Sequence, residues 1–406
     1  MTNVLMLSPG FPAEMPWFTA GLARAGARVL GLGDQPTGAL PEEAREALAD
    51  YVQVPTLWDE AQVLERVRAL DARTPLDRIE CLWEPGMLLA ARLREALGLP
   101  GLDVERTTWF RDKEEMKRKL DAAGIRTPRH ARAASDAEVE QAAERIGFPL
   151  VVKPIAGAGS ADTHRIDDRA ALREILPRLR HVPEVSVEEF IDGDEFTFDT
   201  ISADGRILYS NVAWYRPRPL IGRSVEWISP QTVTLRDPER EDLAVGREMG
   251  RRVLKALGFR TGFTHMEWFR TPAGEAVFGE IAARAPGARS VDLMNYACDF
   301  DAFSAWGEAV CQGRISQPIE RRYNAVVVFK RARGQGRIAR IEGLERLVAR
   351  YRPHVVCVDL LPVGSPRRDW KQTLLSDGFV IVRHPDLDAA LEMADRFGTD
   401  LQIHAA

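Results

Sequence analysis

Two acidic residues on a predicted hairpin carry the strongest chemical signal in the sequence. Strands are predicted over Gly262–Phe269 and Glu275–Ile281, with the turn centred on Pro272-Ala273. In that register, period-two alternation makes Glu267 and Glu280 diagonal neighbours on one face of the sheet. Two carboxylates this close, with no lysine on either strand, need a proton or a divalent cation between them. Hard oxygen ligands favour Mg²⁺, and a solvated acidic hairpin is the alternative.

Neighbours of this pair are candidates for further roles. His265 shares the predicted face with Phe278 and the two carboxylates, and we expect it to donate to a carboxylate or a phosphate, with metal ligation as the alternative. Arg284 follows the second strand in the segment EIAARAPGARS, where it can meet an anion near the metal. Arg289 is a second candidate for that task. In an arginine-rich chain, either of the two can also be an ordinary surface residue.

A strand that runs into a glycine-rich loop is predicted to bind phosphate. The apolar strand Leu150–Lys153 leads into PIAGAGSADTH, where Gly157, Gly159 and Ser160 can bring backbone N–H groups close to a polyphosphate. Only seven of the 55 basic residues are lysines, so a lysine at this strand end is notable as a flexible positive charge. The loop lacks the G-x-x-x-x-G-K-[ST] pattern, and a plain turn beside a snorkelling lysine is the alternative.

Acidic strand ends further along are candidates for binding a nucleoside. Glu188 and Glu189 end one predicted strand, and Glu195 opens the next. A carboxylate and backbone amides can match the adenine edge while a second carboxylate binds ribose hydroxyls, although acidic strand ends are commonly just solvated. Lys113, the first residue of a helix capped by Asp112, is a further phosphate candidate. We assign the other lysines of that helix to a solvated face.

These residues must be positioned by alternating strands and helices. The first hundred residues predict a βαβ opening with a parallel sheet, whose strands and helices are expected at Val4–Ser8, Trp17–Ala25, Arg28–Gly33, Tyr51–Val54, Ile79–Trp83 and Gly86–Leu97. No G-x-G-x-x-G follows the first strand, so we do not expect dinucleotide binding. Capping signals at Ser135 and Asp237 predict two later helices, the second over Pro238–Leu257, and another helix is expected near Asp168–Leu179. Beyond Gln312–Arg322 a smaller α+β unit is expected.

Composition narrows the class of protein. The 406 residues are 45% hydrophobic and 28% charged, which is typical of a soluble globular protein. A formal charge of −5 without long runs of one sign argues against a nucleic-acid or membrane-surface partner. We find no apolar stretch of about 18 residues and no signal-peptide pattern. The four cysteines have no metal-binding or framework spacing, so we expect a reducing compartment, the cytoplasm.

Taken in order, five segments resemble the ATP-grasp family: RDKEEMKRKLDAAGIRTP, GFPLVVKPIAGAGS, VEEFIDGDEFTFD, GFTHMEWF and AVFGEIAAR. The resemblance covers about residues 1–310, and the rest resembles the closing domain of the carboxylate–amine ligase branch, which includes amino-acid ligases. It implies an α/β protein with an ATP-grasp fold, an N-terminal βαβ (Rossmann-like) domain, a mobile lid and a C-terminal α+β domain. The expected domains are 1–108, 109–311 with a lid at about 125–185, and 312–406.

The resemblance also implies roles for the candidate residues. The residues that would bind ATP phosphates are Lys113, Lys153 and the loop with Gly157, Gly159 and Ser160. Those that would hold the adenosine are Glu188, the Glu189 carbonyl and the Ile191 amide for adenine, and Glu195 for ribose. Glu267 and Glu280 would hold Mg²⁺, with Mn²⁺ as an alternative. Arg284 matches an arginine that contacts the acyl phosphate or substrate carboxylate, and Lys153 and His265 complete the expected catalytic residues.

The implied activity is an ATP-dependent carboxylate–amine ligase that forms an amide or peptide bond through an acyl phosphate and releases ADP and phosphate. Its partners would be a small carboxylate and an amine, and a homodimer is left open. One alternative is a non-catalytic nucleotide-binding protein, since Ala282 stands where many members have a metal-binding Asn. Another is a bicarbonate-activating carboxylase type, which would need a biotinyl domain or partner. The segment 212–236 is irregular and also contains Arg223. Its residues Trp214, Tyr215, Arg216, Arg218 and Trp227 either line an acceptor pocket or belong to an ordinary packed loop.

Overall fold

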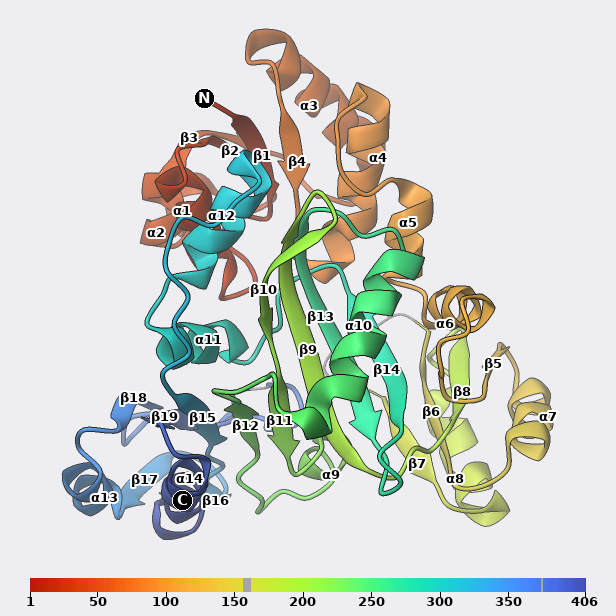
Figure 1. Ribbon diagram of the computed structural model, residues 1–406, viewed down its shortest axis with the longest axis vertical. Helices are drawn as coiled ribbons and strands as arrows, with labels where there is room; N and C mark the ends of the chain where they lie inside the picture. Colours follow the sequence, from red (N-terminus) through yellow and green to blue (C-terminus); the bar gives the residue numbers. More distant parts are fainter. Residues whose placement is uncertain (156–161, 374) are drawn as a thin grey trace.

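The computed structural model describes residues 1–155, 162–373 and 375–406. Its first unit is a parallel sheet in the order β3-β2-β1-β4, flanked by helices (Figure 1). The strands are β1 (Asn3–Leu7), β2 (Arg28–Gly33), β3 (Leu48–Gln53) and β4 (Arg78–Glu80). The helices are α1 (Met15–Arg24), α2 (Glu42–Ala47), α3 (Glu60–Arg73), α4 (Met87–Leu97) and α5 (Val104–Trp109). The predicted βαβ opening is therefore confirmed. The next helix, α6 (Lys113–Ala122), packs in a different apolar core, whose members include Met116, Leu120 and Phe196.

A small antiparallel sheet with two helices forms the second unit, which projects at the lower right of Figure 1. The strand order is β5-β8-β6-β7, and the strands are β5 (His130–Ala133), β6 (Leu150–Pro154), β7 (His164–Ile166) and β8 (Val185–Glu189). Helix α7 (Asp136–Ile146) begins at the predicted cap, because Ser135 accepts a backbone N–H group there. Helix α8 (Arg169–Leu179) lies where a helix was expected, and Asp168 accepts the backbone N–H of Ala171 at its start. The unit has its own apolar core, which includes Val139, Leu150 and Leu172.

A long antiparallel sheet forms the body of the molecule. Its order is β14-β13-β9-β11-β12-β15-β19-β18, with β10 paired to β9. The strands are β9 (Asp194–Ala203), β10 (Arg206–Asn211), β11 (Ala213–Arg216), β12 (Gln231–Thr234), β13 (Gly262–Arg270), β14 (Ala276–Ala282), β15 (Asn324–Phe329), β18 (Val355–Leu360) and β19 (Gly378–His384). Strands from the last 95 residues thus continue the sheet that carries the predicted metal hairpin.

Helices cover this sheet and a small second sheet completes the C-terminal end. The helices are α9 (Pro219–Gly222), α10 (Ala244–Ala256), α11 (Ser290–Cys298), α12 (Ala302–Gln312), α13 (Leu344–Arg350) and α14 (Leu387–Asp400). The small sheet has the order β16-β20-β17, from Arg333–Gly334, Gln402–Ala405 and Ile338–Glu342. Helix α12 packs on α1 and so joins the first unit to the body. No helix of the described residues is long and apolar enough to span a membrane.

One predicted helix begins later than expected. A short 3₁₀ turn at Glu241–Leu243 precedes α10, which starts at Ala244. Asp237 accepts the backbone N–H of Glu239, so it stabilises a local turn and not the helix. The residue before the 3₁₀ turn, Arg240, has extended backbone angles, and this interrupts the helix that Pro238 and Asp237 together predict.

Helix α10 lies against β9, β13 and β14 (Figure 1). Its residue Gly246 faces Trp268 of β13. A Cβ atom at Gly246 would lie 2.2 Å from the ring of Trp268, which is fully buried on β13. The absence of a side chain therefore lets the helix approach the strand that carries Glu267.

We expect Gly246→Ala to destabilise the protein by about 1–3 kcal/mol, because a well-packed core has no room for the added methyl group. The measurement is chemical or thermal unfolding. Gly38→Ala is the matched control, since a Cβ at Gly38 meets no atom within 4 Å. Equal stability of the two variants would show that α10 can move away from β13 at no cost.

Candidate active site

The hairpin of β13 and β14 brings two glutamates directly opposite each other. Glu267 pairs with Glu280 and Trp268 pairs with Phe278, with a register shift between the two pairs. The shift leaves Gly279 as an extra residue in β14, and a Cβ there would lie 2.8 Å from the Glu267 carbonyl oxygen. The predicted diagonal arrangement was therefore wrong, because a bulge was not foreseen. Phe278 is buried with Trp268 on the opposite face and does not neighbour the carboxylates.

Two lysines from outside the hairpin reach Glu280. Lys113 Nζ at the start of α6 lies 3.1 Å from Glu280 Oε1, and Lys153 Nζ at the end of β6 lies 3.8 Å from Oε2. Both predicted phosphate lysines thus lie beside a predicted metal ligand. The negative charge of Glu280 is therefore balanced by lysines from α6 and β6. The sequences of the two hairpin strands alone did not reveal these partners.

Glu188 links the two lysine-bearing elements. Its carboxylate lies 3.1 Å from Lys153 Nζ and 2.8 Å from Lys117 Nζ, and it is 4% exposed. Burial favours the neutral acid, but the two ammonium groups outweigh it and hold the pKa of Glu188 well below its usual range. For Lys153, burial opposes the charge, whereas Glu188 and Glu280 raise its pKa above the usual value. Both groups are therefore charged.

Lys117 corrects the sequence analysis, which placed it on a solvated face. Its side chain is fully buried and also donates to the Lys113 carbonyl at 3.3 Å. A signal for this was present in the sequence: Lys113 and Lys117 share the i, i+3, i+4, i+7 spacing with the core residues Met116 and Leu120. A charged residue within the apolar face of a helix indicates that a residue of opposite charge from another element is buried against it.

His265 lies between two carboxylates. Its Nδ1 is 2.6 Å from Asp199 Oδ1, and its Nε2 is 3.6 Å from Glu267 Oε1. Burial by itself lowers the pKa of His265. The carboxylates of Asp199 and Glu267 together outweigh burial and raise the pKa to about 9, so the imidazole is protonated at neutral pH. Asp199 is 1% exposed and also accepts from Thr197 and Asn211, so its oxygens are used within the protein.

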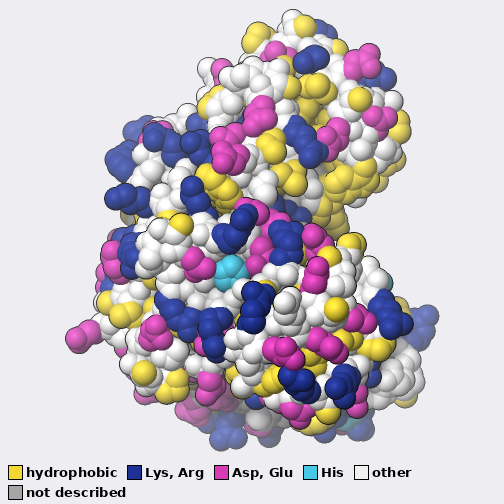
Figure 2. Space-filling model, turned by 90° about the vertical axis from the view of Figure 1, so that its right-hand side faces the viewer, with side chains coloured by type: hydrophobic (Ala, Val, Ile, Leu, Met, Phe, Trp, Pro, Cys, Tyr) yellow, Lys and Arg dark blue, Asp and Glu magenta, His cyan; other side chains and the backbone are white. Residues whose placement is uncertain are grey.

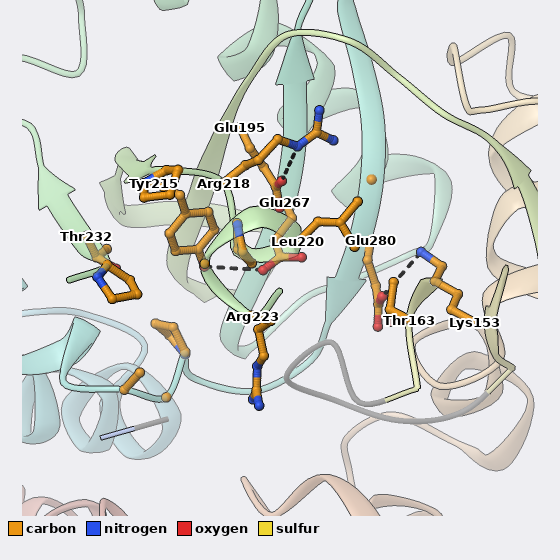
Figure 3. Close-up of a pocket in the computed structure, with 18 of the residues that line it drawn as sticks. Lys153, Thr163, Glu195, Tyr215, Arg218, Leu220, Arg223, Thr232, Glu267 and Glu280 are labelled. Carbon is orange, nitrogen blue, oxygen red and sulfur yellow. Dashed lines mark hydrogen bonds and ion pairs between the residues drawn. The ribbon is translucent and has the colours of Figure 1, made fainter. Parts of the chain in front are cut away.

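Glu195 lies at the other side of Glu267, beside Arg218 (Figure 3). The Arg218 Nε is 3.5 Å from Glu195 Oε2, and Arg218 Nη1 donates to the Ile191 carbonyl at 2.8 Å. The guanidinium also packs over the rings of Phe190 and Phe269, each at 4.8 Å. Burial and, after it, the charge of Glu267 raise the pKa of Glu195 to about 8.

Tyr215 closes this part of the site. Its hydroxyl donates to Glu267 Oε1 at 3.2 Å. Of the irregular segment's residues, Tyr215, Arg218 and Arg223 line the cavity described below, whereas Trp227 is 79% exposed and Trp214 stacks on Phe196.

Arg284 is held by a residue that the sequence analysis missed. Glu84, buried at the start of a 3₁₀ turn (Glu84–Gly86) in the first unit, lies 2.8 Å from Arg284 Nε and 2.7 Å from Nη2. Arg111 pairs with the other oxygen of the same carboxylate. No local pattern identifies Glu84, because its partner is 200 positions away. Arg289 instead faces Asp292 and Asp359, at 3.7 Å each.

One cavity of about 270 Å³ brings most of the predicted site residues together. The predicted residues that line it are Lys113, Lys153, Glu188, Glu189, Ile191, Glu195, His265, Glu267, Glu280 and Arg284. A wider hollow of about 1420 Å³ shares Glu195, Tyr215 and Arg218 with it, so the joint space is large enough for a nucleotide. Gly157, Gly159 and Ser160 lie outside the described residues. On the face seen in Figure 2, acidic and basic side chains are intermixed, without a broad area of one sign.

The donor set of the hairpin fits a magnesium ion. Two opposed carboxylates, Glu267 and Glu280, line the cavity beside the phosphate lysines. In the described part of the chain, no three His, Cys, Asp or Glu residues are grouped to hold a metal. Mg²⁺ is usually bound through one or two carboxylates together with substrate phosphates and water, so a two-carboxylate site suits it.

Comparisons with known proteins agree with this geometry. The model of the ATP-grasp N-terminal domain matches residues 23–101, and that of the ATP-grasp domain matches residues 110–214. The chain therefore contains an ATP-grasp N-terminal domain and an ATP-grasp domain over these residues.

Its relatives include named ligases. The chain is 29% identical over 220 residues to the L-arginine-specific L-amino acid ligase of Bacillus subtilis, covering 52% of each chain. It is 37% identical over 212 residues to the D-alanine–D-alanine ligase of Xanthomonas axonopodis pv. citri, covering 50% of this chain and 64% of that one. The matches thus span about half to two thirds of the length of these relatives. The crystal structure of an L-amino acid ligase from Bacillus licheniformis shares the fold, with a TM-score of 0.79, 22% identity and coverage of 99% and 98%.

We expect Lys117→Met to lower the free energy of unfolding by about 3–5 kcal/mol, because it leaves the Glu188 carboxylate buried with only one of its two cations. Urea unfolding measures this. Lys119→Met on the same helix is the control: that ammonium lies over Trp109 at 4.2 Å and should contribute about 1 kcal/mol or less. A loss no larger than that of the control would contradict the buried position of Lys117.

Proposed function

We propose that the protein is an ATP-dependent carboxylate–amine ligase. The observation that carries the proposal is the convergence, in one cavity, of two phosphate-binding lysines, two opposed carboxylates and an arginine from the end of the same hairpin. We divide the chain into a pre-ATP-grasp domain at 1–108, an ATP-grasp domain at 109–311 and a C-terminal domain at 312–406. The nucleotide would be ATP, and ADP and phosphate would be released.

The reaction balances in two steps. A carboxylate oxygen attacks the terminal phosphorus of ATP, so that the P–O bond to ADP breaks and an acyl phosphate forms. The amine then attacks the acyl carbon, phosphate leaves with the C–O bonding electrons, and the amine loses a proton to form the amide. Mg²⁺, when bound, would neutralise charge on the phosphate oxygens.

The lysines of the site act as fixed positive charges. Lys153 and Lys113 already lie beside Glu280, so a polyphosphate entering the cavity meets cations that are positioned in advance. The carboxylate of Glu188 is occupied by Lys117 and Lys153, which suits it to orient Lys153. In this scheme the Glu189 carbonyl and the Ile191 amide would meet adenine, and Glu195 the ribose.

The protein residues can also protect the reactive intermediate. Segment 125–185 includes β5, β6 and β7 of the small sheet, and as a lid over the cavity it would exclude water from the acyl phosphate. The protonated His265 is a suitable donor to a substrate oxygen or phosphate, because Asp199 fixes its ring. Arg284 would contact the substrate carboxylate or the acyl phosphate.

The rival proposals differ in turnover. A non-catalytic nucleotide-binding protein is favoured by Ala282, which lines the cavity and offers no ligand oxygen. Mg²⁺ tolerates water in place of a protein ligand, so this alanine weakens the site without removing it. ADP release with a panel of amino acids and amines separates a ligase from a binder, and ADP release with bicarbonate in place of the acid identifies the carboxylase type.

Lys153→Met should abolish ATP-dependent ADP release while the protein remains folded, because the methionine keeps the apolar bulk and removes the charge. A coupled assay for ADP and a circular dichroism spectrum measure the two effects. Lys255→Met on the exposed end of α10 is the control and should retain activity. Near-normal turnover of Lys153→Met would refute the phosphate-binding role of β6.

Glu84→Gln should raise KM for the carboxylate substrate about tenfold, because Arg284 loses the charged partner of its Nε and Nη2 atoms. KM for ATP should change little. Glu60→Gln, which disrupts an exposed pair with Arg92, is the control. A selective rise in KM for ATP would place Arg284 at the nucleotide and not at the carboxylate.

A further inference from the structure

The end of the cavity farthest along the sheet is formed largely by the C-terminal part of the chain and is cationic. Arg331 follows β15, and Trp370 and Ser376 come from the segment before β19. Arg223 reaches the same cavity from the end of α9, and Figure 3 shows its guanidinium group pointing away from the Tyr215–Glu267 pair. None of the sequence motifs assigned above includes Arg331.

Neither arginine makes an ion pair with a carboxylate among the described residues. Arg331 Nη1 donates to the Val225 carbonyl at 2.8 Å and its Nε to Ser376 Oγ at 3.4 Å, while Nη2 has no hydrogen bond to the described residues. The plane lies 4.4 Å over the ring of Trp370. Arg223 donates only once, from Nη1 to the Lys371 carbonyl at 2.6 Å. Donor capacity therefore remains on both side chains.

The surrounding charges leave an excess of positive charge. Arg367 pairs with Glu226 and lies 3.6 Å from the fully buried Asp377. A further guanidinium, that of Arg368, donates from Nη1 to the Ser376 carbonyl at 3.1 Å. The two carboxylates are therefore outnumbered by the guanidinium groups around them. Burial and, after it, the charge of Arg223 lower the pKa of Arg331 to about 10, so its charge is unfavourable where it stands. An anion would reduce this imbalance.

We propose that Arg331 and Arg223 bind a carboxylate of the amine substrate. This inference rests on the ligase function proposed above and adds an acceptor-specific subsite, distinct from Arg284, which faces the reacting carboxylate. A carboxylate presents two coplanar oxygens, which match the planar donor edge of a guanidinium. The acceptor would lie along the cavity with its amine toward Glu280 and its carboxylate at the C-terminal end.

The test compares acceptors that differ only in the anionic group. Glycine and L-alanine are assayed against glycinamide, L-alaninamide and aminomethylphosphonate, with the donor acid and ATP saturating. The same compounds are titrated by calorimetry into the full-length enzyme with ADP. The variants are Arg331→Gln and Arg223→Gln, and Arg340→Gln on the exposed face of β17 is the control. Arg223 donates a single hydrogen bond, so Arg223→Gln should fold normally. It keeps the test decisive even if Arg331→Gln fails to fold.

We expect both variants to raise KM for glycine and L-alanine about tenfold or more, and to weaken their binding equally. KM for ATP and for the amides should stay within about twofold. Equal effects on acids and amides, no effect on either, or stronger binding of aminomethylphosphonate would overturn the proposal. Arg331-dependent binding of the acids without any ADP release would uphold the subsite and reject the ligase, whereas ADP release with unchanged acceptor KM would do the reverse.

Discussion

The structure depends on mutual neutralisation of buried charges around the β13–β14 hairpin. Glu188 and Glu280 are held by lysines from α6 and β6, and Glu267 is held by the protonated His265. Removing one member of such a network leaves an uncompensated buried charge, which costs several kcal/mol. In the proposed function the same groups would exchange partners: the lysines would bind phosphate oxygens and the carboxylates would bind the metal. Stability without ligand and readiness to bind therefore come from the same side chains.

A continuous sheet makes these distances reproducible. The strands that carry Glu195, Glu267 and Glu280 are hydrogen-bonded through β11 and β12 to β15, from which Arg331 follows. Sites on one sheet move together, so the phosphate end and the cationic end of the cavity keep a fixed separation. The first unit is attached to this body by α1 on α12 and by the contact of Glu84 with Arg284. In the proposed ligase, a carboxylate bound at Arg284 would therefore be linked to both units.

Local patterns were sufficient for much of this protein. Strands and helix starts followed from alternation, glycine stops and capping residues such as Asp112 and Ser135, because these signals act within one turn or strand. The family motifs placed Lys153, Glu195 and the two hairpin glutamates in one cavity, as the structure has them. The late start of α10 shows the limit of such local signals. A proline and a capping residue predicted a helix from residue 238, but the backbone angles of Arg240 are not helical.

The sequence by itself determined which elements form and which residue types could carry phosphate and metal chemistry. Only the tertiary structure decided the partners. The bulge at Gly279 set Glu267 opposite Glu280, and the packing of α6 buried Lys117 against Glu188. Glu84 and Arg331 reach the site from distant segments, and no periodicity within a strand or helix encodes such contacts. Pairing across 200 residues is a property of packing, because it depends on where whole units dock and not on local backbone preference.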